Sequence, residues 1–300
     1  MLKVKTWISA ARLRTLPLSI SGILAGTGMA VREGFFNLYI LIFALLTTLG
    51  LQILSNFAND YGDGVKGTDN EDRVGPMRAL QSGIITDKEM RKGMILTAII
   101  TMIFAGILIF IAFDKEEIYY VLLFFVFAVL AVAAAVKYTV GKTAYGYRGL
   151  GDLFVFLFFG LLSTVGSYFL YSKGLNASIW LIATIMGLLS TAVLNLNNMR
   201  DLQSDAKVGK ITLAVKMGEI KSKKYHFILI LAALVLTFLY IGITSSYLNL
   251  FMLLGFIPLL LHLKVVRSNQ IPRNLDPELK KVALSTVFIA LIYLITGFFY

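Results

Sequence analysis

The 300-residue chain is strongly apolar: 58% of its residues are hydrophobic, 15% are charged, and the mean hydropathy is +0.79. Soluble globular domains have roughly a quarter of their residues charged, so the composition excludes an ordinary soluble protein and favours one embedded in a membrane. The sequence has no cysteine, which excludes disulfides, thiolate metal sites and a cysteine nucleophile.

The first predicted element is a basic, amphipathic helix on the membrane surface, formed by the start of "MLKVKTWISAARLRTLPLSI". Nine apolar stretches follow, each close to the length that spans a bilayer, although Pro258 interrupts the eighth. The sequence therefore predicts an all-α, polytopic membrane bundle of about nine transmembrane helices, in a single domain over residues 1–300. The stretches lie at about 15–32, 37–58, 94–113, 119–136, 151–171, 178–199, 225–244, 247–263 and 282–299.

Positive charge is divided unevenly between the two sides of such a bundle. With nine spans, the N-terminus and the loops after the even-numbered spans hold 25 of the 28 Lys and Arg residues, and the other side holds only Arg32, Lys115 and Lys173. Basic loops stay in the cytoplasm, so we expect a cytoplasmic N-terminus, cytoplasmic cap loops and an external C-terminus. The net charge of +11 is then explained by topology and by attraction to anionic membrane lipid, and no nucleic-acid partner is expected.

A polar segment follows the second span, "LSNFANDYGDGVKGTDNEDRVGPMRALQSG" (residues 54–83). Asn59 and Asp63 are four residues apart, as are Asn56 and Asp60. If the helix continues for one more turn, the members of each pair share a face. We expect Asn59 and Asp63 to face a ligand. For Asp60 two interpretations stay open, a ligand-binding residue and an ordinary solvated acid.

A second acidic segment follows the sixth span, "AVLNLNNMRDLQSDAKVGKITLAVKMG" (residues 192–218). Asn197, Asp201 and Asp205 recur every four residues and form a stripe of one amide and two carboxylates. Both segments follow even-numbered spans, so they lie on one side of the membrane and are expected to converge. Such oxygen ligands suit Mg²⁺, which usually joins protein carboxylates to substrate phosphates. The two motifs together predict a Mg²⁺-diphosphate site.

Basic and polar side chains that would serve a diphosphate or its reaction partner lie on the same side, several of them in "KYTVGKTAYGYRGLGD" (residues 137–152). The candidate substrate-binding residues are Arg14, Asn56, Asp60, Arg73, Arg78, Lys142, Tyr147, Arg148 and Asp152.

One order of elements occurs twice in the chain: an apolar span, an acidic helix face, a glycine-containing loop and the next span. This repetition fits a duplicated four-helix unit. The two units would cover about 15–136 and 151–263, with a last helix at 282–299.

The motifs resemble those of a known family, the UbiA-type intramembrane prenyltransferases. "NDYGD" and "NNMRDLQSD" are similar to its two aspartate-rich motifs, "ARLRTLPLSISGILAGT" to its N-terminal stretch, and "YTVGK" (Tyr138–Lys142) to its Tyr-Pro-x-x-Lys stretch. The resemblance covers roughly residues 5–230, and it is most specific to the menaquinone-pathway branch of the family. One departure is Gly67, which stands where the family has a third acidic residue and leaves Asp69 or Asp72 to replace it.

The resemblance implies a nine-helix bundle in a bacterial plasma (inner) membrane, with a central cavity capped by cytoplasmic loops. It implies transfer of a polyprenyl group from polyprenyl diphosphate to 1,4-dihydroxy-2-naphthoate, with loss of diphosphate and CO₂. Tyr138 would stabilise the carbocation through its ring face, and Asp60 or Asp152 would take the acceptor's proton. The implied catalytic residues are Asp63, Asp201, Lys142 and Tyr138. The implied Mg²⁺ ligands are Asn59, Asp63, Asp69, Asn197, Asp201 and Asp205.

Other functions stay open at this point. The same chemistry on another aromatic acceptor, such as 4-hydroxybenzoate, would need only a few changes in the cavity. A secondary transporter is a more distant alternative, because transport sites lie near the bilayer midplane and both acidic motifs fall at span ends on one side. A structural scaffold would have no reason to carry two Mg²⁺-type stripes. The sequence does not indicate the prenyl chain length or the oligomeric state.

Overall fold

The computed structural model describes residues 2–68 and 77–300, apart from the side chain of Arg14, and every regular element in these ranges is helical. The prediction of an all-α bundle is confirmed. The main helices are α1 (Leu2–Ala11), α2 (Leu16–Arg32), α3 (Leu38–Val65), α4 (Asp87–Ala112), α5 (Ile118–Lys137), α6 (Gly151–Val155), α7 (Ser167–Ser172), α8 (Ala177–Arg200), α9 (Leu202–Lys207), α10 (Leu213–Thr244), α11 (Phe256–Ser268) and α12 (Asp276–Gly297).

Eight helical segments in the described residues are long and apolar enough to cross a membrane, and α2, with 17 residues, is a shorter apolar helix beside them. These nine elements match the nine predicted stretches. The protein is therefore an integral membrane protein, with α1 as the predicted short helix before the first span.

Two helices begin well before the apolar stretches that revealed them. α4 starts at Asp87, because Thr86 accepts a hydrogen bond from the Glu89 amide and Glu89 accepts one from the Thr86 amide. α10 starts at Leu213, where the Thr212 hydroxyl accepts from the Val215 amide, but Gly218 (φ 75°, ψ 172°) interrupts it and separates this first turn from the long helix of the span. Hydropathy marks only the part of a helix within the membrane, whereas caps mark where the helix begins.

Two spans are irregular. The fifth is continuous from Gly151 to Ser172, but its middle, Phe156–Gly166, is a π-helix. The eighth begins as a 3₁₀-helix, Tyr247–Gly255, and continues as α11. Pro258 lies in the first turn of α11, at the junction with the 3₁₀-helix, and the span continues past it to Ser268.

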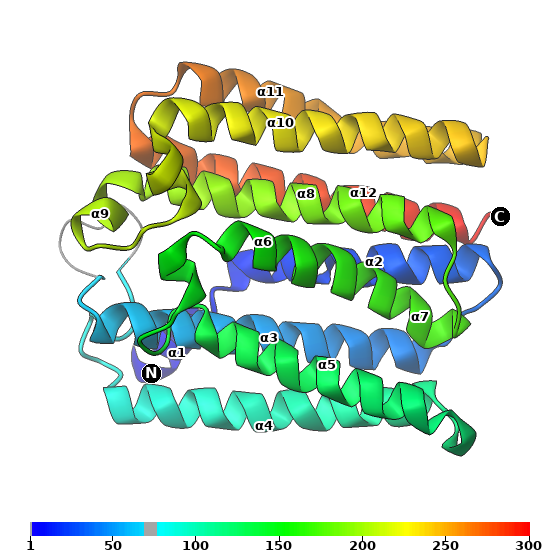
Figure 1. Ribbon diagram of the computed structural model, residues 1–300, viewed down its shortest axis with the longest axis horizontal. Helices are drawn as coiled ribbons and strands as arrows, with labels where there is room; N and C mark the ends of the chain where they lie inside the picture. The colour runs from blue at the N-terminus through cyan, green and yellow to red at the C-terminus, as the bar shows by residue number, and fades with distance from the viewer. Residues whose placement is uncertain (1, 69–76) are drawn as a thin grey trace.

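The long helices lie side by side, with α1 and α9 at one end of the bundle and the C-terminus at the other (Figure 1). Helix α3 packs against α4, α8 against α10, and α2 against α12. Consequently the C-terminal end of α3, the turn before α6 and the α8–α9 junction all lie at the end that carries α1.

The centre of the bundle is packed backbone to backbone. A Cβ atom added to Gly160 of the π-helix would lie 2.4 Å from the Cα atom of Gly187 in α8. One added to Gly26 of α2 would lie 2.3 Å from the Thr164 carbonyl oxygen, also in the π-helix. Small residues permit such close approach between membrane helices, so α2, the π-helix and α8 form one tightly joined wall.

Candidate active site

A cavity of about 530 Å³ lies within the bundle and reaches the end that carries both acidic motifs. Its walls come from α2, α3, α5, the π-helix, α8 and the start of α12. Five of the residues predicted as metal ligands line it: Asn59, Asp63, Asn197, Asp201 and Asp205.

The first motif lies on the last turns of α3, which continues to Val65 as the i,i+4 pairs required. Asp63 is buried, with 4% of its surface exposed. The Tyr147 hydroxyl donates to Asp63 Oδ1 at 2.7 Å, and Lys210 Nζ lies 3.3 Å from Asp63 Oδ2. The carboxylate is thus fixed in orientation and compensated in charge.

The second motif spans a helix break. α8 ends at Arg200, and Asp201 has φ −94° and ψ 6° before α9 begins. The buried Arg200 guanidinium binds both Asp201 oxygens, at 2.8 and 2.7 Å, and donates to the Asn197 side-chain oxygen at 2.9 Å. It also contacts Asp276 of α12 at 2.6 Å, so the last helix is tied to this motif.

Lys210 joins the two motifs, and sequence reasoning missed it. Its ammonium group lies 3.3 Å from Asp63 and 3.8 Å from Asp205, and it lines the cavity. Burial alone would lower the pKa of Lys210, but Asp63 and Asp205 raise it above its ordinary value, so the side chain stays charged. The available signal was its position five residues after the last acid of the stripe.

The second pair on α3 faces the N-terminal segment. Asn56 donates to the Ala11 carbonyl at 2.8 Å, and Asp60 forms an ion pair with Arg12 at 2.6 Å. Asp60 also lies 3.6 Å from Arg78 Nε. Asp60 is not among the cavity-lining residues, whereas Arg12 and Arg78 are, so this carboxylate positions two cations at the cavity.

Arg12 was also missed, although Arg14, two residues away, was predicted. Arg12 occupies the left-handed region with φ 50°, at the break between α1 and α2, and its Nε is buried with no partner among the described residues. The sequence "ARLRT" presents two arginines and does not indicate which one turns inward. The side chain of Arg14 lies outside the described part of the structure, as do Asp69, Asp72 and Arg73.

The turn between α5 and α6 contributes tyrosines to the site and leaves its basic residues outside. Tyr138 lines the cavity, and burial together with the nearby Asp152 charge raises its pKa above the ordinary value. Lys142 and Arg148 are exposed and do not line the cavity. Within residues 2–68 and 77–300, the structure therefore gives these two predicted residues no direct contact with the acidic motifs.

Asp152 lies at the start of α6 and is 95% buried, with 5% of its surface exposed. Neither of its carboxylate oxygens has a hydrogen-bond partner among the described residues. It does not itself line the cavity, and the Tyr138 hydroxyl lies against the neighbouring Gly151. A buried carboxylate without a partner is costly unless a ligand or proton satisfies it.

The acidic cluster fits Mg²⁺ that binds together with a phosphate ligand. Within residues 2–68 and 77–300, no three carboxylate, imidazole or thiolate groups are placed to hold a metal ion by themselves. Mg²⁺ usually takes one or two carboxylates and completes its octahedron with water and substrate oxygens. One ammonium group contacts Asp63 and Asp205 together, so a single cation reaches both motifs.

The comparison with known proteins decides the family. The model of the UbiA prenyltransferase family matches residues 19–292. The chain belongs to the UbiA prenyltransferase family. The protein is therefore a membrane prenyltransferase, and the resemblance carried by the two aspartate-rich motifs is confirmed.

Individual UbiA relatives agree with this assignment. The chain is 41% identical over 295 residues to the 1,4-dihydroxy-2-naphthoate octaprenyltransferase of Haemophilus influenzae, covering 97% of this chain and 95% of that protein. It is 40% identical over 277 residues to the enzyme of the same name from Escherichia coli, covering 92% and 87%. A UbiA homolog from Archaeoglobus fulgidus, solved with DMAPP and Mg²⁺, is similar in fold, with a TM-score of 0.71, 15% identity and 98% of both chains covered.

Proposed function

We propose that the protein transfers a polyprenyl group from a polyprenyl diphosphate to 1,4-dihydroxy-2-naphthoate, with loss of diphosphate and CO₂. The acceptor is suggested by the names of the two relatives that are about 40% identical over most of the chain. The observation that carries the chemistry is the meeting of two acidic motifs and three cations at one end of an apolar cavity.

The charged end of the cavity would hold the donor's diphosphate. Mg²⁺, held by Asn59 and Asp63 on one side and by Asn197, Asp201 and Asp205 on the other, would supply positive charge to the departing diphosphate. Arg78 and Lys210, which line the same end, would neutralise the charge that remains.

The cavity walls would protect the cationic carbon. When the allylic carbon–oxygen bond breaks, the electron pair leaves with the diphosphate, and the prenyl carbon becomes electrophilic. Apolar walls exclude water that would otherwise capture it. The Tyr138 ring lines the cavity and would stabilise the developing positive charge through its π face.

The acceptor would attack through the ring carbon that bears its carboxylate. The new carbon–carbon bond forms there, and the bond to the carboxylate breaks to release CO₂ and restore the aromatic ring. A proton taken from the acceptor's hydroxyl to increase its reactivity is returned when CO₂ leaves. Asp60 is engaged by Arg12, and Asp152 has unpartnered oxygens but does not line the cavity, so neither carboxylate is assigned this proton.

The decisive experiment is mass spectrometry of the product formed by purified protein from dihydroxynaphthoate, 4-hydroxybenzoate and a mixture of prenyl diphosphates. We expect prenylated naphthoquinol lacking the carboxylate, and no product after chelation. Asp63→Ala and Asp201→Ala should abolish turnover, whereas Glu116→Ala, an exposed acid elsewhere in the chain, should not. Prenylation of 4-hydroxybenzoate alone would replace the proposed acceptor.

We also place the charged end of the cavity at the cytoplasmic face of a bacterial plasma membrane, because 25 of the 28 basic residues fall on that side of the nine spans. The cysteine-free chain permits a direct test with single-cysteine variants. In intact cells, a membrane-impermeant thiol reagent should label Tyr247→Cys and leave Lys142→Cys unlabelled. The reverse pattern would invert the orientation.

A further inference from the structure

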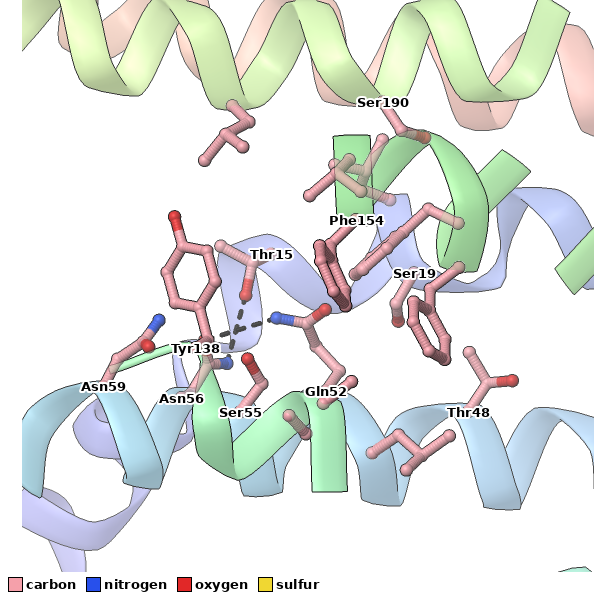
Figure 2. Close-up of a pocket in the computed structure, with 18 of the residues that line it drawn as sticks. Thr15, Ser19, Thr48, Gln52, Ser55, Asn56, Asn59, Tyr138, Phe154 and Ser190 are labelled. Atoms are coloured by element: carbon pink, nitrogen blue, oxygen red, sulfur yellow. Dashed lines mark hydrogen bonds between the residues drawn. The ribbon is translucent and has the colours of Figure 1, made fainter. Parts of the chain in front are cut away.

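Several polar side chains line the cavity deeper in the bundle than the acidic motifs. We call four of them the inner polar band: Thr48, Gln52 and Ser55 on α3, with Ser190 on α8. The three on α3 are spaced by four and three residues, so they share the face that carries Asn59 and Asp63. At 1.5 Å per residue, Gln52 lies about 10 Å along the helix from Asn59. Figure 2 shows these side chains at the cavity wall.

The band has unused hydrogen-bonding capacity. Among the described residues, the hydroxyls of Thr48, Ser55 and Ser190 make no hydrogen bond. Gln52 donates to the Asn56 side-chain oxygen at 3.2 Å, which leaves its own carbonyl oxygen without a partner in the same part of the chain. Polar groups within membrane spans are costly and mark ligand sites, so the band requires a polar occupant.

The donor does not provide that occupant. Its diphosphate belongs at the acidic motifs, and its hydrocarbon tail has no group to bond to an amide or hydroxyl. A second substrate with polar groups on an apolar body fits the band. Because the band carries no charged side chain, it suits hydroxyl groups rather than a carboxylate.

Flat aromatic walls adjoin the band. Tyr145 and Phe154 stack with ring centroids 4.0 Å apart, and Phe154 and Phe158 stack at 6.1 Å with an interplanar angle of 10°. All three line the cavity, and Figure 2 labels Phe154 and Gln52 among its lining side chains. A column of stacked rings suits a planar aromatic ligand.

A carboxylate would find its partner nearer the cavity mouth. Arg12 lines the same cavity, and its Nε is buried without a partner among the described residues. An aromatic acid with its hydroxyls on the band and its carboxylate toward Arg12 would present the carboxylate-bearing carbon to the donor end. This is the carbon at which the proposed reaction occurs.

We propose that the inner polar band is the acceptor's binding site, with the ring against the Tyr145, Phe154 and Phe158 column and a hydroxyl group bonded to Gln52 or Ser55. This inference rests on the proposed function, and it adds the site and orientation of the acceptor. No metal ligand takes part in it.

The test is steady-state kinetics of Gln52→Leu, Ser55→Ala and the double variant, with donor and acceptor varied separately. Loss of one or two hydrogen bonds should raise the acceptor KM about tenfold in each single variant and more in the double, with the donor KM within about twofold. Thr184→Val, a hydroxyl removed from the outer face of α8, should change neither. An unchanged acceptor KM, or an equal rise in donor KM, would overturn the inference.

A ligand series supplies a readout that misfolding would not imitate. In wild-type protein, 4-hydroxy-2-naphthoate should inhibit about tenfold more strongly than 2-naphthoate, because only the former has a hydroxyl, set apart from its carboxylate, for the band. The double variant should lose this preference while still binding both, and retention of the preference would refute the assignment. If wild-type protein prenylates no naphthoate, the proposed function fails; if it does and the preference persists in the variant, only this inference fails.

Discussion

Replacement of Lys210 by Met tests whether the cation between the acidic motifs also serves the donor. Its ammonium group lies 3.3 Å from Asp63 and 3.8 Å from Asp205. At an effective dielectric constant of about 20, the nearer contact alone is worth about 5 kcal/mol before desolvation is subtracted. Removing one partner of such a buried pair leaves uncompensated charge and costs about 3 kcal/mol of stability.

The catalytic effect should be larger than the structural one. Loss of one preorganised positive group facing a departing anion lowers turnover about 10²- to 10³-fold. The apparent affinity for Mg²⁺ should rise at the same time, because a competing cation near Asp63 and Asp205 is gone. Lys210→Arg keeps the charge and should retain most activity, which makes it the matched control.

The assay is the initial rate of prenyl transfer by protein in lipid nanodiscs, with donor and Mg²⁺ varied separately. Thermal unfolding measured in parallel shows that each variant is folded at the assay temperature. If Lys210→Met has the wild-type turnover, donor KM and Mg²⁺ requirement, the argument from its position is wrong.

The pH dependence of this residue follows from the direction of its pKa shift. The folded pKa is raised above the ordinary 10.5, so the stabilising charge is fully present below pH 10.5 and is lost only as the pH rises through the higher folded value. Titration of Lys210 should therefore leave activity unchanged between about pH 6 and pH 9.

Three further changes should have distinct effects. Tyr147→Phe removes the 2.7 Å hydrogen bond to Asp63 and should raise the donor KM about five- to tenfold, measured by initial rates, with a smaller change in turnover. Gly62→Ala places a Cβ atom 2.7 Å from the Thr139 side chain, and should lower the unfolding free energy by about 1–3 kcal/mol, seen as a lower melting temperature. Chelation by EDTA should stop product formation, and added Mg²⁺ but not K⁺ should restore it; turnover that persists in EDTA would remove the metal from the mechanism.

The fold and the acidic motifs were accessible from the sequence because both are local patterns. Runs of apolar residues give the spans, and four-residue spacing places Asn59 with Asp63 on one helical face. Spacing alone does not show which face points inward, and neighbouring residues on a helix point about 100° apart. Asp60 accordingly faces Arg12 and Arg78, although its residue type suits the cavity equally well.

The cations could not be assigned from the sequence because their partners are distant in the chain. Lys210 is 147 residues from Asp63, and Asp276 is 76 residues from Arg200. Lys142 was predicted from its motif, but the turn that carries it leaves its side chain exposed. Whether a turn residue points into a bundle depends on helices that the local sequence does not describe.

The contact between Gly160 and Gly187 joins two walls of the cavity closely. α2, the π-helix and α8 touch through backbone atoms, so displacing any of them would break many contacts at once. Helix α5 borders the same cavity, yet only 6% of its apolar span is enclosed by protein. The range of prenyl lengths that the cavity accepts should therefore depend on how far α5 moves into the surrounding lipid. The composition of the bilayer would then influence the chain length of the product.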